Sequence, residues 1–258
     1  MTGLDALKDK IAICVLSYDG SSDLWDPFFD YFDRAWPNCP LPLYLLTNFK
    51  DYDRDGRVTT IKVGEDVDWS SNMLRGLPEI PQERILFIFD DFFVRKVNIE
   101  RLTHAITLAD KHDWPYITMH PNNYQTDRVA PGVKKISETG IYRCTLVYGL
   151  FKKDTLLSLL KAGESAWDFE IESGKRARGI DLYSVDKKVF KDYHLLRKGF
   201  WMRRGYSTLN KEYEFKDRPV ETHFNFLVRE TKEFLFRLYH RTVPPTIIER
   251  KEKRRTDK

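Results

Sequence analysis

The stretch RILFIFDD, residues 84–91, decides the fold. Its consecutive apolar residues, 85–89, are β-branched, aromatic or leucine, and they predict a strand buried on both faces. The strand runs directly into Asp90 and Asp91, and two adjacent carboxylates at a strand end must be hydrated, paired or bound to a metal. Residues 92–94 return at once to apolar character, which favours a functional site. A strand-end turn with hydrated carboxylates also fits these residues.

Short apolar segments alternate with amphipathic segments on both sides of this strand. The predicted strands are 11–17, 43–47, 57–63, 84–89 and 115–119, and the predicted helices are 26–36, 69–77 and 99–111, the last capped by Asn98. This order is typical of an α/β fold with a mostly parallel sheet and helices on both faces. Ligands bind at the carboxyl ends of such strands, where residues 17–19 and 90–91 lie.

The second half of the chain is less regular. We expect a strand at 140–150, helices at 153–162 and from 167, an extended segment at 187–195, a loop at 198–206 and an amphipathic helix at 224–239. The predicted organisation is a single domain over residues 1–240, in two halves, 1–130 and 131–240. It ends in a C-terminal helical extension and a basic tail at 241–258.

The composition predicts a cytoplasmic globular protein, with 258 residues of which 41% are hydrophobic. Residues 1–10 are polar and charged, and the apolar runs are far shorter than the ~20 residues of a membrane helix. We therefore expect neither a signal peptide nor a membrane anchor. Cys14, Cys39 and Cys144 lack a metal-like spacing, which predicts reduced thiols.

The net charge of +4 lies in the tail. Residues 241–258 contain seven basic and three acidic residues, so the remaining chain is formally neutral. We expect no nucleic-acid partner, because that would require a basic face on the folded domain. The tail either contacts an anionic membrane surface, as in a peripheral protein on the inner face of the membrane, or is a solvated end.

The segment FIFDDFF, residues 87–93, resembles the acidic DxD-type signature of GT-A glycosyltransferases, in a variant with paired aspartates followed by aromatic residues. Its place about 75 residues after the first strand loop fits that family, and the resemblance covers the order of elements over about the first 130 residues. It implies a bound Mn²⁺ or Mg²⁺ that bridges the protein to the diphosphate of a donor. Asp91 is the first candidate for the metal ligand, and Asp90 is the second.

The same resemblance places the nucleobase and ribose of the donor against the loop after the first strand. Tyr18 would stack on the base beside Ser17, and Asp19 would accept hydrogen bonds from ribose hydroxyls or base N–H groups. An ordinary polar turn explains these three residues equally well. Asn72 and Arg75, on a later predicted helix, are weaker candidates for donor binding.

The segment SAWDFE, residues 165–170, resembles the element that carries the general base of inverting GT-A enzymes. This resemblance implies that Asp168, or alternatively Glu170, removes the proton of the attacking hydroxyl. Ser165 and Asp168 also have the spacing of a capping box, in which Asp168 would satisfy an N–H group at the helix end.

Residues 173–179, SGKRARG, place three cations between glycines. Through Arg176 and Arg178, such a loop would approach a diphosphate and offset the charge of the leaving group. An exposed basic loop explains the segment as well. Tyr148 and Trp201, together with Phe200, would form a sugar-stacking platform for the acceptor, or would be buried aromatic residues.

These observations predict a metal-dependent, inverting glycosyltransferase. The sugar would pass from a nucleotide-sugar donor, bound by residues 1–130, to a hydroxyl of a glycan or lipid-linked glycan, bound by residues 131–240. A bacterial surface polysaccharide such as lipopolysaccharide would be an acceptor of this kind. One alternative is a sugar-nucleotide nucleotidyltransferase, in which a Gly-rich basic segment would replace the acidic residues 18–23. The other is a non-catalytic carbohydrate-binding or assembly module.

Overall fold

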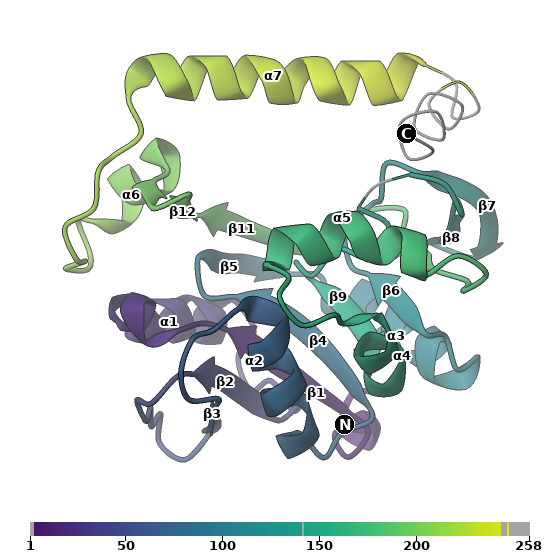
Figure 1. Ribbon diagram of the computed structural model, residues 1–258, viewed down its shortest axis with the longest axis horizontal. Coiled ribbons are helices and arrows are strands. Elements are labelled where there is room, and N and C mark those ends of the chain that lie inside the picture. Colours follow the sequence, from purple (N-terminus) through teal and green to yellow (C-terminus); the bar gives the residue numbers. More distant parts are fainter. Residues whose placement is uncertain (1–2, 141, 244–246, 248–258) are drawn as a thin grey trace.

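A large mixed sheet forms the centre of the computed structural model, which describes residues 3–140, 142–243 and 247 (Figure 1). In sheet order, the nine strands of this described part are β3 (Val58–Lys62), β2 (Leu43–Thr47), β1 (Ile11–Leu16), β4 (Arg84–Phe89), β9 (Gly149–Lys152), β6 (Tyr116–Thr118), β10 (Tyr183–Val185), β8 (Val133–Ile136) and β7 (Gln125–Ala130).

The first half of the chain builds the parallel part of this sheet. Strands β3, β2, β1 and β4 all run in the same direction, whereas β9 is antiparallel to both of its neighbours, β4 and β6. Two small sheets lie outside it, one of β5 (Phe92–Val97) with β11 (Phe190–His194) and one of β12 (Leu196–Arg197) with β13 (Phe200–Trp201). The predicted mostly parallel α/β sheet is confirmed.

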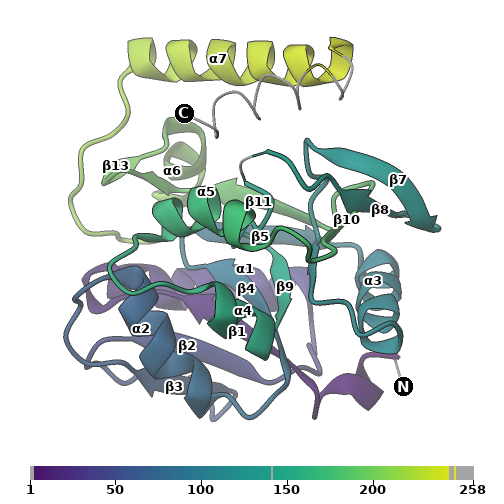
Figure 2. The ribbon, with the colours of Figure 1, turned by 45° about the vertical axis from the view of Figure 1, so that its right-hand side comes forward.

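Helices cover both faces of the sheet, as predicted (Figure 2). They are α1 (Trp25–Ala35), α2 (Trp69–Gly76), α3 (Ile99–Lys111), α4 (Lys153–Leu159), α5 (Ala166–Arg176), α6 (Arg203–Leu209) and α7 (His223–Thr242), with short 3₁₀ helices η1 (Asp5–Leu7), η2 (Asp19–Leu24) and η3 (Leu77–Glu79). The N-cap of α3 is Asn98, whose Oδ1 accepts from the Arg101 N–H at 2.9 Å.

Strand β1 shows how the two layers share one sheet. Its side chains alternate between two hydrophobic cores: Ile13 and Val15 pack with α1 and α3, and Cys14 and Leu16 pack with α2, α4 and α5. All four side chains are buried. A strand buried on both faces has no polar positions, which is why β1 and β4 read as continuous apolar runs in the sequence.

Three predictions for the second half were wrong. The predicted loop at 198–206 contains β13 and the start of α6, and the predicted loop at 173–179 begins inside α5. Within 140–150 the strand begins only at Gly149, because Tyr148 adopts a left-handed conformation (φ 57°) that interrupts extended structure. The predicted helices at 153–162, from 167 and at 224–239 are confirmed as α4, α5 and α7.

Candidate active site

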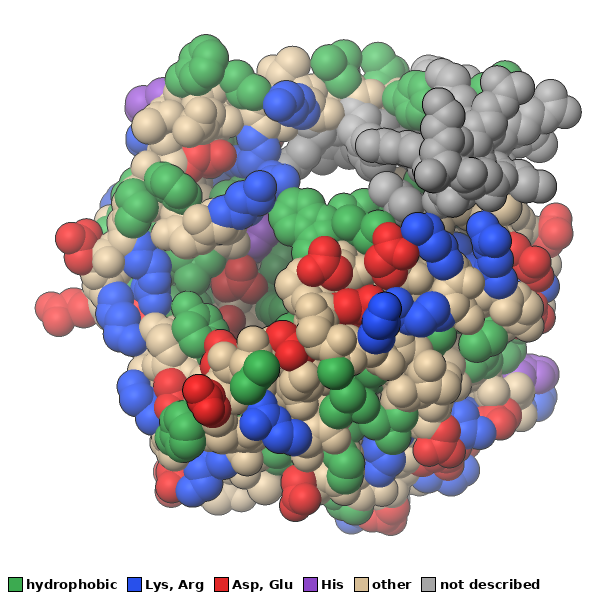
Figure 3. All heavy atoms as spheres, viewed as in Figure 1, with side chains coloured by type: hydrophobic (Ala, Val, Ile, Leu, Met, Phe, Trp, Pro, Cys, Tyr) green, Lys and Arg blue, Asp and Glu red, His purple; other side chains and the backbone are tan. Residues whose placement is uncertain are grey.

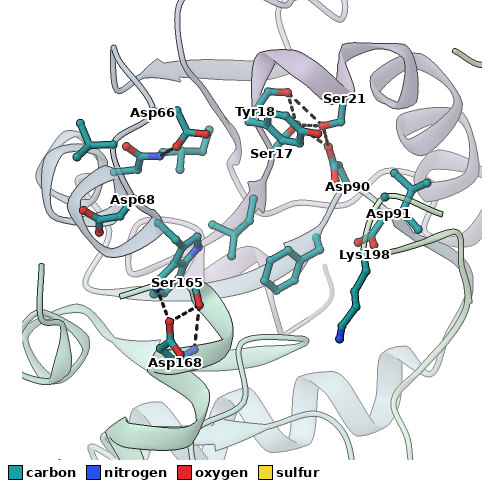
Figure 4. A pocket seen from close by; sticks show the side chains of 18 of the residues that line it. Ser17, Tyr18, Ser21, Asp66, Asp68, Asp90, Asp91, Ser165, Asp168 and Lys198 are labelled. Atoms are coloured by element: carbon teal, nitrogen blue, oxygen red, sulfur yellow. Dashed lines mark hydrogen bonds between the residues drawn. The ribbon is translucent and has the colours of Figure 1, made fainter. Parts of the chain in front are cut away.

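A cavity of about 700 Å³ opens where the parallel strands end (Figure 4). The loop after β1, the segment leading into α2, the turn between β4 and β5, the start of α5, the β12–β13 turn and Arg218 all contribute to its lining. Its lining residues are Leu16, Ser17, Tyr18, Ser21, Leu46, Asp66, Val67, Asp68, Trp69, Asn72, Phe89, Asp90, Asp91, Gly163, Ser165, Asp168, Leu196, Lys198, Gly199 and Arg218.

Parallel pairing of β1 with β4 brings the two ends of these strands together. Leu16 pairs with Phe89, so the next residues, Ser17 and Asp90, leave the sheet side by side. The Ser17 hydroxyl donates to Asp90 Oδ2 at 2.6 Å, and the Ser21 hydroxyl donates to the same oxygen. The indole N–H of Trp25 donates to Ser17 Oγ at 2.7 Å and fixes that hydroxyl.

The Asp90 carboxyl is therefore directed at the loop after β1 (Figure 4). Its pKa is raised to about 7 by burial and by the neighbouring Asp91, while the hydrogen bonds from Ser17 and Ser21 act in the opposite direction. Asp90 lines the cavity. Its Oδ2 accepts hydrogen bonds from two hydroxyls of the loop after β1 and so holds that loop in place. Its predicted metal and donor contacts stay predictions.

Asp91 is held at the edge of the cavity by the second sheet. Its Oδ2 lies 3.3 Å from Nε2 of His194, whose ring stacks on Phe92 with a centroid distance of 4.2 Å. The pairing of β11 with β5 sets this contact, because His194 lies opposite Phe92 in the register. No local pattern in the sequence indicates that pairing, so His194 was not among the predicted residues.

A divalent cation is compatible with this pair. A carboxylate and an imidazole are both ligands that Mn²⁺ accepts, and the Asp91 side chain is partly exposed to the cavity. Within the described residues, no group of three or more His, Cys, Asp or Glu side chains is arranged to hold a metal. A cation at Asp91 and His194 would thus need phosphate oxygens and water to complete its coordination.

The structure does not place Asp19, a predicted donor-binding residue, among the residues that line the cavity. Its carboxylate accepts main-chain N–H groups of Asn48 and Phe49, both at 3.0 Å, and of Lys50 at 3.2 Å. Asp19 therefore ties the loop after β1 to the loop after β2 and is not among the cavity-lining residues. Tyr18 is 49% exposed at the cavity, as the predicted stacking position requires.

Acidic residues before α2 form another wall of the cavity. Asp68 caps α2 by accepting from the Ser71 N–H at 2.8 Å. Asp66 accepts from the Asn72 side-chain amide at 2.6 Å, and Arg75 donates to Asn72 Oδ1 at 2.6 Å. Asn72 therefore lines the cavity, and its predicted contact with the donor stays a prediction. Arg75 does not line the cavity, but its hydrogen bond holds the Asn72 side chain in place.

Asp168 has the capping role that the sequence left open, and it also lies at the cavity, where its role as a base stays a prediction. It forms the capping box with Ser165, and it also lines the cavity. The hydrogen bonds from the Ser165 hydroxyl (2.6 Å) and N–H (3.2 Å) both reach Oδ2, so the cap uses a single oxygen. These bonds lower the pKa of Asp168 and keep the carboxylate ionised.

Glu170, the alternative base, lies outside the cavity lining. Its Oε1 accepts from the Leu146 N–H at 2.7 Å and fixes the loop before β9. Burial raises its pKa to about 7, which the hydrogen bond from Leu146 partly opposes. The position indicates a structural role for this carboxyl.

The predicted basic loop does not reach the cavity. Arg176 lies at the far end of α5 from Asp168 and forms two 2.7 Å hydrogen bonds with Glu164. Neither Arg176 nor Arg178 lines the cavity, so their predicted contact with the diphosphate is not supported. Gly174, which predicted a loop, lies inside α5. The helix packs closely against Gly140 there, because a Cβ added at Gly174 would lie only 3.3 Å from Gly140 O.

Lys198 and Arg218 are the Lys and Arg residues that line the cavity. Lys198 sits in the β12–β13 turn with φ 52°, and its Nζ lies 5.3 Å from the ring centroid of Trp167. Arg218 forms two 2.7 Å hydrogen bonds with Asp23, and its guanidinium lies 4.8 Å from the ring centroid of Trp201. Sequence reasoning missed both residues, because they enter the site from distant segments.

The predicted acceptor platform is not supported. Tyr148 is buried and stacks on Phe190 with centroids 4.4 Å apart, and Trp201 is buried against Tyr206 at 5.0 Å. Neither ring lines the cavity, and the alternative of buried aromatic residues is correct. Phe200 is exposed but also lies outside the lining.

Known structures share this fold. S. aureus TarS in complex with UDP-GlcNAc matches with a TM-score of 0.53 and 13% sequence identity, over 74% of this chain and 59% of that chain. TarS in complex with UDP gives a TM-score of 0.50 and 11% identity, over 71% and 60%. The fold is of the GT-A type. This chain spans about three fifths of the TarS chains that it matches, and no family model or curated protein sequence matches it.

The buried Glu170 predicts a pH-dependent stability. Its folded pKa, about 7, lies above its ordinary value, so the folded state binds more protons between about pH 4.5 and 7. The free energy of unfolding of the wild type should fall as pH rises through this window, and Glu170→Gln should remove that part of the fall. Glu172→Gln, on the same helix and exposed to solvent, is the control. Urea unfolding at several pH values measures both, and a pH-independent effect of Glu170→Gln would contradict the prediction.

The ion pair of Asp23 and Arg218 should couple strongly in a double-mutant cycle. Both side chains are about nine-tenths buried, and they share two hydrogen bonds. We expect Asp23→Asn and Arg218→Gln to show a coupling free energy of about 1 to 3 kcal/mol in chemical unfolding. The exposed pair of Asp51 and Lys62 is the control and should couple by less than about 1 kcal/mol. Equal coupling in the two cycles would show that Asp23 and Arg218 behave as a surface pair.

Proposed function

We propose that this protein is a glycosyltransferase that moves a sugar from a nucleotide-sugar donor to a hydroxyl of a glycan or lipid-linked glycan. The observation that carries the proposal is the cavity, which joins Asp91 with His194 at the strand ends to Asp168 at the start of α5. Asp91 and Asp168 both line this cavity, and His194 lies against Asp91, so a metal-compatible pair and an ionised carboxylate meet at one site, as such a transfer would use them. The TarS structures contain UDP-GlcNAc and UDP, which supports a nucleotide-sugar donor for the same fold.

The donor diphosphate would lie against the floor of the cavity. Asp91 and His194 would hold Mn²⁺ or Mg²⁺, which when bound supplies positive charge that stabilises the departing diphosphate. Lys198 and Arg218 line the same cavity and add positive charge from the protein itself. Tyr18, exposed after β1, would stack on the nucleobase.

Asp168 would act as the general base. Its carboxylate accepts the proton of the acceptor hydroxyl, whose oxygen attacks the anomeric carbon as the bond from that carbon to the diphosphate oxygen breaks. The nucleoside diphosphate leaves with the bonding electrons, and attack from the opposite side inverts the anomeric configuration. The hydrogen bonds of Ser165 to Oδ2 keep the carboxylate ionised and leave Oδ1 for the acceptor.

Released products distinguish this reaction from nucleotidyl transfer. A glycosyltransferase releases a nucleoside diphosphate, or CMP when the donor is a CMP-sugar, whereas a nucleotidyltransferase that forms a sugar nucleotide releases pyrophosphate. A screen of UDP-, GDP-, CMP- and dTDP-sugars by thermal shift, with and without Mn²⁺, identifies the donor first, since a ligand that binds only the folded state raises its stability. Donor binding without turnover on any glycan acceptor would favour a binding module.

Loss of the Asp91 carboxylate tests the metal. Asp91→Asn should nearly abolish turnover and the Mn²⁺-dependent part of donor binding, because it removes a charged oxygen ligand while keeping the shape of the side chain. His194→Gln should weaken Mn²⁺-dependent donor binding, and Asp90→Asn should have a milder effect. Isothermal titration with donor, with and without Mn²⁺, measures this. Unchanged Mn²⁺-dependent binding in Asp91→Asn would remove Asp91 from the proposed metal site.

Two substitutions separate the base from the cap. Asp168→Asn should lower turnover by about 10² to 10⁴ with donor binding retained, because the amide cannot accept the proton. Ser165→Ala removes the capping partner and should cost about 1 kcal/mol of stability while leaving most of the turnover. Glycosyl transfer assays and urea unfolding on both variants measure this. An active but destabilised Asp168→Asn protein would leave Asp168 with the capping role alone.

A further inference from the structure

Helix α7 carries a band of large apolar side chains that the protein leaves exposed. Phe224 is 74% exposed, Leu227 61%, Phe234 59% and Leu235 56%. With 3.6 residues per turn, these four side chains fall within about 100° of the helix circumference, and Leu238 lies in the same sector. We call these five residues the apolar band. Single exposed apolar residues are ordinary, but a continuous band of this kind marks an interaction surface.

The apolar band faces away from the rest of the protein. Helix α7 is joined to the rest of the protein near its N-terminal end, where Arg229 donates to Glu221 at 2.9 Å and the Glu221 N–H donates to Trp201 O at 2.9 Å, and near its C-terminal end, where Tyr239 packs against a hydrophobic core. By helical spacing, Arg229 lies roughly 170° and Tyr239 roughly 90° from the centre of the apolar band. Figure 3 shows hydrophobic side chains along the outer edge of α7, and Figures 1 and 2 show the helix running along the outside of the body.

The charge of the adjoining sequence indicates which partner fits the band. Residues 241–258, which follow directly, contain seven basic and three acidic residues. Apolar side chains next to concentrated positive charge match a surface that offers both hydrocarbon and negative charge, as an anionic bilayer does. A second copy of the chain would add a second positive segment and is not complementary in charge. Among the described residues, no helix is long and apolar enough to cross a membrane.

We propose that α7 lies flat on an anionic membrane, with the apolar band inserted at the level of the head groups and the basic tail in contact with them. The proposal does not depend on the reaction that the cavity catalyses. Apolar insertion and electrostatic attraction are the two contributions that reversible attachment requires, since one alone gives only marginal binding. The tail lies largely outside the described residues, so its part in the proposal rests on its sequence.

Binding of the full chain to vesicles tests the proposal. The chain should sediment with phosphatidylglycerol vesicles and much less with neutral phosphatidylcholine vesicles, and binding should weaken when salt rises from about 0.1 M to 0.5 M. Phe234→Ser with Leu235→Ser should lower the partition coefficient by about tenfold or more. Asn225→Ser with Phe226→Ser makes the same number of serine substitutions on the other side of the helix, about 130° from the centre of the apolar band, and should leave binding unchanged.

Further variants and a second measurement decide between partners. A variant that combines Arg250→Gln, Lys251→Gln, Lys253→Gln, Arg254→Gln and Arg255→Gln should bind anionic vesicles less and lose the salt dependence of binding. Equal binding by the two double-serine variants, or no binding to anionic vesicles at low salt, would overturn the proposal. A stable dimer in sedimentation equilibrium would also overturn the proposal, if Phe234→Ser with Leu235→Ser dissociates that dimer and vesicles do not compete with its formation. Circular dichroism confirms that each variant keeps its helix content.

Discussion

The parallel pairing of β1 with β4 is the constraint on which the site depends. Six residue pairs, from Ile11 with Arg84 to Leu16 with Phe89, hold the strands in one register. Since both strands are buried on both faces, a slip of one residue would exchange the two hydrophobic cores that β1 serves. Packing on both sides of the sheet therefore fixes where each strand ends. The ends deliver Ser17 and Asp90 to one place, and the remaining walls of the cavity are arranged around them.

Most of the first half could be predicted because its signals are local. Strands 43–47 and 84–89 and the helix at 99–111 match the structure to the residue, since apolar runs, caps and turn residues lie within the elements themselves. Asp91 and Asp168, which line the cavity, could be singled out for the same reason, because one follows an apolar strand and the other lies at a helix cap. His194, Lys198 and Arg218 were not found, because each depends on a contact between segments distant in sequence. Glycine misled once, at Gly174, where the missing side chain serves close packing inside a helix.

The buried carboxyls illustrate how one residue type takes different roles through its surroundings. Asp90 and Glu170 are both buried with pKa values raised to about 7, and both orient a loop through hydrogen bonds. Asp168 lies at the surface of the cavity, where hydrogen bonds to Ser165 lower its pKa. Asp23 is buried too, yet the hydrogen bonds from Arg218 and from the Lys216 N–H outweigh burial and lower its pKa. Position in the fold, more than residue type, thus separates a carboxylate available for chemistry from one that holds structure.

The segment from Lys216 to Glu221 has a fixed length. Lys216 N–H and Arg218 both donate to Asp23, Val220 bridges to Trp201, and Glu221 holds Arg229 of α7. An insertion or deletion of one residue would displace Arg218 by about 3.3 Å relative to these anchors and withdraw it from the cavity wall. Homologues that diverge freely in the residues of this segment should therefore still conserve its residue count.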